Sequence, residues 1–255
     1  MITLPAFVVV AATAFGVLVD LPPVYSQAPC DEFFYLVQQW GPTFCKHERQ
    51  PCQVEPVSSH FTLHGLWPNY EKGRCPGKKG AWPQNCDDSS TELPPECDCP
   101  FDLSLLADLQ SSMLENWPSY GQTNARFWQH EWDKHGSCAI TYEQEIGGPV
   151  TSQHQYFDKA LQLREQCNVL ESLKAVGISP GSNAPARDFL AAVKEGCGVS
   201  PQIACHPGSS DLEEFRFCYD DEFRAMDCQQ GKEVEDCRRD QITLPVWRQT
   251  STAAA

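Results

Sequence analysis

Alternating apolar and polar side chains predict strands at both ends of the chain. Residues Phe33–Trp40 alternate aromatic or aliphatic side chains with polar ones, which is typical of a strand with one buried face. Residues His60–Trp67 are predicted to form a second strand that ends at Pro68. Shorter strands are expected in the C-terminal third, at Gln202–Cys205, Glu214–Tyr219 and Ile242–Trp247.

Helical spacing fills the middle of the chain. Residues Leu103–Trp117 carry apolar side chains three and four positions apart and stop before Pro118. Asn124 is expected to cap a helix that runs through Phe127–His135. Further helices are predicted at Gln153–Val176 and Ala184–Glu195. This order of strands, helices and strands predicts a single α+β domain with a central antiparallel sheet flanked by helices.

The N-terminus has the pattern of a secretory signal peptide. Residues Ala6–Val19 form an apolar run too short for an ordinary membrane span, and small residues near Ser26 offer a cleavage site. We interpret residues 1–26 as the signal peptide. The remaining residues, 27–255, are expected to form one domain with a core at about 33–247 and a polar tail at 248–255. No other run is apolar enough to predict a membrane span in the mature chain.

Cysteine content and charge indicate the compartment. The chain has 14 cysteines, which points to an oxidising environment and a disulfide-stapled fold, with an irregular stapled loop over residues 71–100. Its formal charge is −15, so it will not coat nucleic acid by general attraction. Action on a polyanion would need local attraction or acidic conditions. We expect a secreted protein in the extracellular space or a vacuole.

Two short segments concentrate side chains suited to acid–base chemistry. Within Phe127–Cys138, two histidines, a glutamate and a lysine fall within a span of six positions, namely His130, Glu131, Lys134 and His135. The segment Phe61–Pro68 adds His64 close to the ring of Trp67. Imidazoles that titrate near neutrality, a fixed cation and aromatic faces are the parts needed for metal-free chemistry on a phosphodiester.

The spacing of the two helical histidines does not favour a zinc hydrolase. An α-helix advances about 100° per residue, which places His130 and His135 about 140° apart. By the same geometry His130 shares a face with Lys134, and Glu131 shares a neighbouring face with His135. Zinc proteases place their histidines at i and i+4 as His-Glu-x-x-His, whereas the gap here is five.

The remaining histidines and tryptophans have simpler interpretations. A lone histidine is most often a satisfied, partly buried side chain, and this applies to His47, His60, His154 and His206. Trp128 and Trp132 are expected to anchor the core. For Trp67, just past the strand histidine, packing and base stacking both stay open.

Two motifs of this chain resemble the active-site segments of the T-two ribonucleases, and they occur in the same order as in that family. They are His-Gly-Leu-Trp-Pro, starting at His64, and His-Glu-Trp-x-Lys-His-Gly-x-Cys, starting at His130. The flanking sequence is similar to the plant S-like members. The resemblance extends from about Phe33 to Trp247, nearly the whole mature chain.

The resemblance implies an endoribonuclease, an RNA-cyclising phosphorus–oxygen lyase, that needs no metal or other cofactor. The 2′-hydroxyl of single-stranded RNA would attack the adjacent phosphorus and give a 2′,3′-cyclic phosphate and a free 5′-hydroxyl. DNA lacks this hydroxyl and should not be cleaved. RNA is therefore the expected partner, and the enzyme is expected to act as a monomer.

Residue roles also follow from the resemblance. His135 would be the general base and His64 the general acid. His130 would bind the phosphate, while Glu131 and Lys134 would stabilise the transition state. Residues at the matching base sites are Trp67, Gln39 and Phe127.

The resemblance further implies four disulfides: Cys45–Cys52, Cys86–Cys138, Cys205–Cys237 and Cys218–Cys228. The chain departs from the plant pattern where Gln53 replaces a usual cysteine, and its partner after Asn-Trp-Pro is absent as well. Six cysteines stay unassigned: Cys30, Cys75, Cys97, Cys99, Cys167 and Cys197. Of these, Cys167 and Cys197 lie on successive predicted helices and could pair. A zinc site at Cys97 and Cys99 is not favoured in a secreted chain.

Two other functions compete with an RNA-degrading enzyme. A catalytically silent storage or recognition protein would keep the fold without the chemistry, but all five acid–base side chains are present. A self-incompatibility ribonuclease would share the activity, yet such proteins tend to be basic and glycosylated. This chain is acidic and has no Asn-X-Ser/Thr sequon, so the S-like interpretation is preferred.

Overall fold

The computed structural model describes residues 32–48, 52, 58–70, 82–87, 99–146, 148–228, 234–235, 237 and 241–247. The predicted signal peptide, the polar tail, most of the predicted loop at 71–100 and three cysteines (Cys30, Cys75 and Cys97) lie outside these residues. In the described part, no helix is long and apolar enough to cross a membrane.

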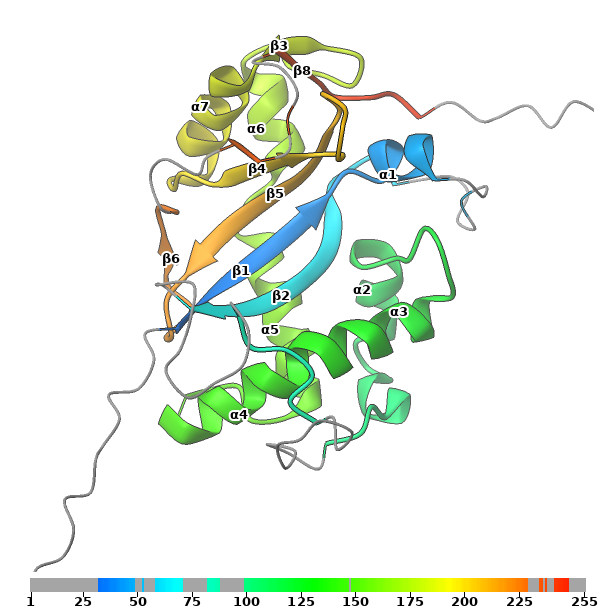
Figure 1. Ribbon diagram of the computed structural model, residues 1–255, viewed down its shortest axis with the longest axis vertical. Coiled ribbons are helices and arrows are strands. Elements are labelled where there is room, and N and C mark those ends of the chain that lie inside the picture. The colour runs from blue at the N-terminus through cyan, green and yellow to red at the C-terminus, as the bar shows by residue number, and fades with distance from the viewer. Residues whose placement is uncertain are drawn as a thin grey trace, which may run out of the picture.

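A mixed sheet forms the centre of the molecule (Figure 1). Its strands follow the order β2-β1-β5-β4-β7, with β6 paired to β5. Their bounds are β1 Glu32–Gln39, β2 Thr62–Tyr70, β4 Gln202–Cys205, β5 Leu212–Tyr219, β6 Ala225–Met226 and β7 Val234–Glu235. The pairs are antiparallel except for β4 with β7. The predicted antiparallel α+β fold is therefore confirmed, with one parallel pair at an edge.

Helices surround this sheet, together with a small second sheet of β3 (Asn183–Pro185) and β8 (Gln241–Thr243). The helical elements are α1 Gly41–His47, a 3₁₀ turn Leu103–Leu106, α2 Gln110–Asn116, α3 Asn124–Glu131, a π-helical turn Trp132–Gly136, α4 Ser137–Ile146, α5 Gln153–Glu165, α6 Val169–Ala175 and α7 Ala186–Cys197. In Figure 1, α2, α3 and α4 lie beside the β2 edge, whereas α6 and α7 lie beside β4. Helix α5 contacts β1 and β2.

Several predicted boundaries are wrong for local reasons. Strand β2 continues through Pro68 to Tyr70, which an edge strand permits because its outer side needs no ladder donors. The predicted helix Leu103–Trp117 is instead a 3₁₀ turn followed by α2, and Leu105 on its predicted apolar face is 53% exposed. Its side chains therefore do not form one continuous buried stripe.

The later helices also begin and end differently from the prediction. Gln153–Val176 is two helices, because the Asn168 side chain accepts a hydrogen bond from the Glu171 N–H and starts α6. Thr123, rather than Asn124, caps α3 in the same way through the Arg126 N–H. The first residues of the predicted helix Ala184–Glu195 belong to β3, and α7 begins at Ala186. The predicted strand Ile242–Trp247 is reduced to β8 and its extended continuation past Pro245.

Disulfides staple the described fold at five places. Four bridges are the pairs that the resemblance implies: Cys45–Cys52, Cys86–Cys138, Cys205–Cys237 and Cys218–Cys228. The fifth joins Cys167 to Cys197 and so ties the start of α6 to the end of α7. Cys99 is also disulfide-bonded. These bridges fix helices and strand ends around the core.

Candidate active site

His64 lies at an irregularity in β2. Val37 of β1 pairs with Gly65, and the next residue of β1, Gln38, pairs with Leu63, so His64 is an extra residue without a ladder partner. A β-bulge of this kind re-aims a side chain and leaves a backbone carbonyl to be satisfied elsewhere. The Trp117 indole N–H donates to the carbonyl of His64 at 2.8 Å. The bulge is therefore held from the α2 side.

The second segment contains a π-helical turn where a regular α-helix is predicted. The Ser137 N–H donates to the carbonyl of Trp132, five residues back, and this single wide turn separates α3 from α4. A wide turn rotates less per residue, so His130 and His135 lie closer in angle than the predicted 140°. The main-chain N–H of Asn85 donates to the carbonyl of Lys134 within this turn at 3.0 Å.

Glu131, on the second segment, is buried where the two segments meet. Its side chain is 1% exposed, and its Oε2 accepts a hydrogen bond from the Trp67 indole N–H at 2.9 Å. A Cβ on Gly65 would overlap both Glu131 Oε2 and Trp67 Nε1. Glycine at 65 is therefore required by this close approach. The sequence motif contains Gly65, but sequence reasoning gave it no role.

The Trp67 ring brings His64 and His135 together. It stacks on His135 with ring centroids 5.0 Å apart and planes at 24°, and it meets His64 edge-on at 5.0 Å. His64 Nε2 is also 3.8 Å from Glu131 Oε1. The strand and the helix, predicted separately, thus place His64, Glu131 and His135 in one cluster.

The pKa values of the two histidines in this cluster are shifted in opposite directions. Burial disfavours the charge on His64, but the hydrogen bond to Glu214 and the Glu214 charge outweigh this and raise its pKa. For His135, burial together with the nearby charges of Lys134 and His64 lowers the pKa well below the usual 6.5. The two shifts therefore favour a protonated His64 and a neutral His135.

Of the other predicted residues, His130 and Lys134 lie toward solvent. His130 is exposed, and burial of part of its ring followed by the charges of Lys134 and His64 lowers its pKa. Phe127 is 9% exposed, with its ring centroid 5.9 Å from that of His64. Gln39 is buried, and its side-chain amide donates to the Leu63 carbonyl at 3.4 Å.

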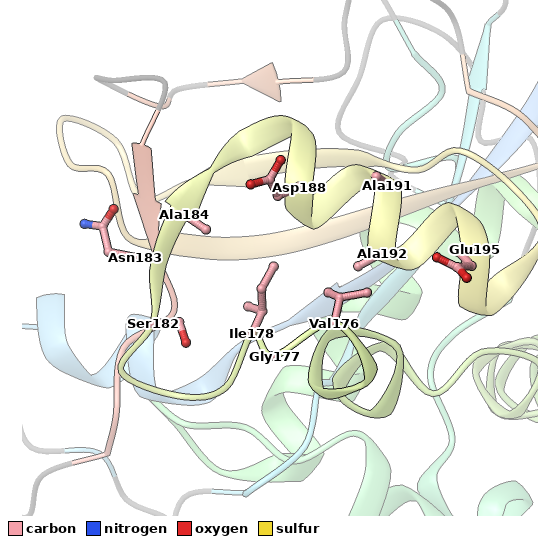
Figure 2. Close-up of a pocket in the computed structure, with 10 residues that line it drawn as sticks. All are labelled: Val176, Gly177, Ile178, Ser182, Asn183, Ala184, Asp188, Ala191, Ala192 and Glu195. Atoms are coloured by element: carbon pink, nitrogen blue, oxygen red, sulfur yellow. The ribbon is translucent and has the colours of Figure 1, made fainter.

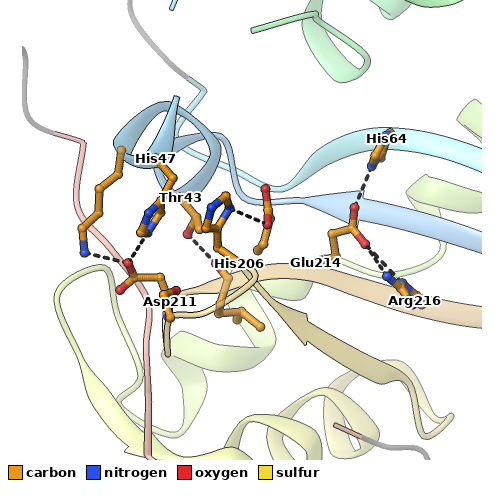
Figure 3. A network of polar contacts seen from close by, with 11 residues as sticks. Thr43, His47, His64, His206, Asp211, Glu214 and Arg216 are labelled. Carbon is orange, nitrogen blue, oxygen red and sulfur yellow. Dashed lines mark hydrogen bonds and ion pairs between the residues drawn. The ribbon is translucent and has the colours of Figure 1, made fainter. Parts of the chain in front are cut away.

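Sequence reasoning missed Glu214, on β5. Its Oε1 lies 2.6 Å from His64 Nδ1, a hydrogen bond that joins residues 150 positions apart (Figure 3). No local spacing connects the two. A usable signal was the carboxylate of Glu214 inside a predicted strand of otherwise largely apolar residues, because such a side chain needs a partner when the strand is buried.

Histidines and pockets elsewhere differ from this cluster. His47 and His206 stack with centroids 4.0 Å apart, bind Asp211 and Glu213 respectively, and help to fix α1 against β5 (Figure 3). A pocket of about 470 Å³ lies between α6, β3 and α7 (Figure 2) but contains none of the predicted site residues. Within the described ranges, no group of three or more His, Cys, Asp or Glu side chains could hold a metal ion.

Burial of Glu131 has a measurable effect on stability. Burial raises its pKa despite the opposing His64 charge and Trp67 hydrogen bond. A carboxyl whose folded-state pKa is raised is most favourable below its unfolded pKa and loses stability as pH rises through the folded value. Glu131→Gln should therefore raise the melting temperature at pH 7 by roughly 2–4 °C for each kcal/mol gained, and should have little effect below about pH 4.

Differential scanning calorimetry at both pH values would measure this effect. The exposed Glu171→Gln on α6, which loses only a surface pair with Lys174, is the matched control and should change little. A lower melting temperature of Glu131→Gln at pH 7 would show that the attraction to His64 exceeds the burial penalty.

Two imidazoles and a buried carboxylate that meet around the Trp67 indole are the groups that an enzyme using acid–base chemistry requires. The comparisons identify the family. The Ribonuclease T2 family model matches residues 31–228, and the chain belongs to this family. It is thus a ribonuclease-family protein, and the matched residues contain the two histidine segments described above.

Plant ribonucleases are among its relatives. Ribonuclease 1 of Arabidopsis thaliana is 35% identical over 80% of this chain and 84% of its own length. Extracellular ribonuclease LE and intracellular ribonuclease LX of Solanum lycopersicum are each 35% identical over 74% of this chain. The matches span 76% of the length of LE and 73% of the length of LX. The crystal structure of RNase NT in complex with 5′-AMP matches with a TM-score of 0.64 and 33% identity, over 84% of this chain and 98% of that one.

Proposed function

We propose that the protein is a metal-independent endoribonuclease that cleaves single-stranded RNA by attack of the 2′-hydroxyl on the adjacent phosphorus. One observation carries the proposal: His64 and His135 meet on the same Trp67 ring with pKa values displaced in opposite directions. Transesterification needs one neutral and one protonated imidazole at once.

His135 is the proposed general base. Its lowered pKa keeps the ring neutral, so it can take the 2′-hydroxyl proton as the oxygen bonds to phosphorus. The ring is 4% exposed and stacks against Trp67, which restricts its orientation. Because the base is already oriented, less entropy is lost when the transition state forms.

His64 is the proposed general acid. Its raised pKa keeps a proton on the ring, which passes to the 5′-oxygen as the phosphorus–oxygen bond breaks and the 2′,3′-cyclic phosphate forms. With 32% of its side chain exposed, His64 remains accessible to substrate. The Lys134 ammonium would oppose the phosphate charge, a local attraction in an otherwise acidic protein, and the His130 ring would bind the phosphate by hydrogen bonding.

Base binding is proposed for the aromatic side chains near His64. Trp67 and Phe127 both have rings within 6 Å of the His64 ring, measured between centroids. Stacking of bases on such rings is tolerant of sequence. The contribution of Gln39 would be indirect, because its buried amide binds the Leu63 carbonyl and so supports the residue before His64.

We also propose that the protein follows the secretory pathway to the extracellular space or a vacuole. The disulfides in the described fold and the apolar N-terminal run favour an oxidising route. The convergence of the acid–base side chains argues against a silent storage protein. The acidic charge and the lack of an Asn-X-Ser/Thr sequon argue against a self-incompatibility determinant, which would share the activity.

A dinucleoside monophosphate assay in EDTA tests the reaction directly. We expect cleavage to 2′,3′-cyclic phosphate and 5′-hydroxyl products with no loss of rate on chelation, since protein groups alone would move the protons. The matched control is the 2′-deoxy dinucleotide, which should remain intact. Products with a 5′-phosphate, cleavage of the deoxy substrate or activity abolished by EDTA would each contradict the proposal.

A further inference from the structure

The carboxylate of Glu214 is fixed on both of its oxygens. Oε1 lies 2.6 Å from His64 Nδ1, and Oε2 accepts hydrogen bonds from the Nε and Nη2 of Arg216, each at 3.1 Å. Glu214 is 8% exposed. Figure 3 shows His64, Glu214 and Arg216 in a line of dashed contacts. A chance ion pair would not need hydrogen bonds to both oxygens of the carboxylate.

The sheet architecture accounts for this contact between strands that are not neighbours. Strand β1 separates β2 from β5, which places the two outer strands about 10 Å apart. His64 sits at the bulge of β2, and Glu214 is paired with Gln39 on β1. The two side chains therefore reach toward each other over β1. The extra residue in β2 gives His64 a direction that the regular ladder does not specify.

We propose that Glu214 is a positioning residue for His64: its carboxylate accepts the Nδ1–H and leaves Nε2 as the atom that donates to the leaving group. This inference rests on the proposed ribonuclease activity. Nε2 lies 3.8 Å from Glu131 Oε1, on the side of the other site residues. In the reaction, the Nε2 proton passes to the 5′-oxygen, the phosphorus–oxygen bond breaks, and Glu214 keeps its charge throughout.

The two buried carboxylates beside His64 thus differ in role. Despite burial, the His64 hydrogen bond and Arg216 lower the pKa of Glu214, which favours its ionised form. Burial instead raises the pKa of Glu131. The titratable groups facing His64 are Glu213 and Glu214 from β5, Glu131 from α3, and the imidazoles of His130 and His135. Of these, only Glu214 hydrogen-bonds to its ring among the described residues.

The test compares Glu214→Gln with Glu213→Gln, a neighbour that binds His206 and affects His64 through its charge alone. Two readouts are needed: an NMR titration of the His64 ring without RNA, and the pH profile of kcat/KM on a dinucleotide. For Glu214→Gln we expect a lower His64 pKa, an alkaline limb moved to lower pH and a roughly 10- to 100-fold loss at pH 7. For Glu213→Gln we expect the same direction with a smaller change.

An unchanged His64 titration and alkaline limb in Glu214→Gln would overturn the positioning role. If this variant fails to fold, Glu214→Asp carries the test: it keeps the charge but shortens the reach, so the plateau rate should fall while the limb stays near its wild-type position. A wild-type plateau rate in Glu214→Asp would also overturn it. Absence of RNA cleavage by the wild type would refute the proposed function alone, because the titration needs no substrate.

Discussion

Replacing either His64 or His135 by alanine should lower kcat/KM on RNA by about 10²–10⁴-fold, the usual contribution of one acid–base group. The fold should survive both changes, because apolar side chains fill the core. Loss of the buried His135 ring should nevertheless lower the melting temperature. Initial rates on a dinucleotide, with melting curves for each variant, would measure both effects.

The pH profile separates the two roles. In the wild type, kcat/KM should rise with pH through the lowered pKa of His135, as the base loses its proton. It should fall at higher pH through the raised pKa of His64, as the acid loses its proton. His135→Ala should therefore remove the acid limb, and His64→Ala the alkaline limb, from the residual activity.

His154→Ala is the matched control for these variants. His154 lies on α5 at the surface, where it binds Asp108, and its loss should leave rate and profile unchanged. Wild-type rates in both active-site variants would contradict the assignments. Loss of the opposite limb from each variant would show that the two roles are exchanged.

Gly65→Ala should abolish most activity although it adds only one methyl group. The new Cβ would overlap both atoms of the hydrogen bond between Trp67 and Glu131. Relief would move the Trp67 ring on which both histidines pack. Displacement by about 1 Å costs roughly 10²-fold in rate, and overpacking of a buried site costs about 1–3 kcal/mol in stability.

Gly121→Ala provides the comparison for this prediction. Its added Cβ would lie 3.3 Å from the edge of the Phe44 ring, a side chain that can move by the few tenths of an ångström required. Rate and melting temperature should remain near wild type in this variant. A fully active, equally stable Gly65→Ala would show that the strand can shift away from Glu131 without disturbing the histidines.

The sequence predicts the elements better than their limits. Alternating apolar and polar residue types locate β1 and β2, although consecutive residues of β1 are buried on both faces, and helical spacing locates α5 and α7. The exact ends of helices depend on single side-chain hydrogen bonds, such as the caps of α3 at Thr123 and of α6 at Asn168. Hydrophobic periodicity contains no information about these bonds.

The site was predictable as a set of side chains but not as an arrangement. His64, Glu131 and His135 stand out because acid–base groups cluster in two short segments. The bulge at His64, the π turn around His135 and the Glu214 contact arise from tertiary structure, which overrides local spacing. Glu214 in particular reaches the site through two strand pairings.

The bulge in β2 and the π turn fix the number of residues in the two segments that contain them. Each contains one residue more than its regular ladder requires, and each surplus residue sets the direction of an imidazole. Removing one residue from either segment would restore a regular strand or helix and rotate the following side chains to other faces. Over evolutionary time these segments can therefore accept substitutions outside the site residues, but insertions and deletions should be confined to the loops outside them.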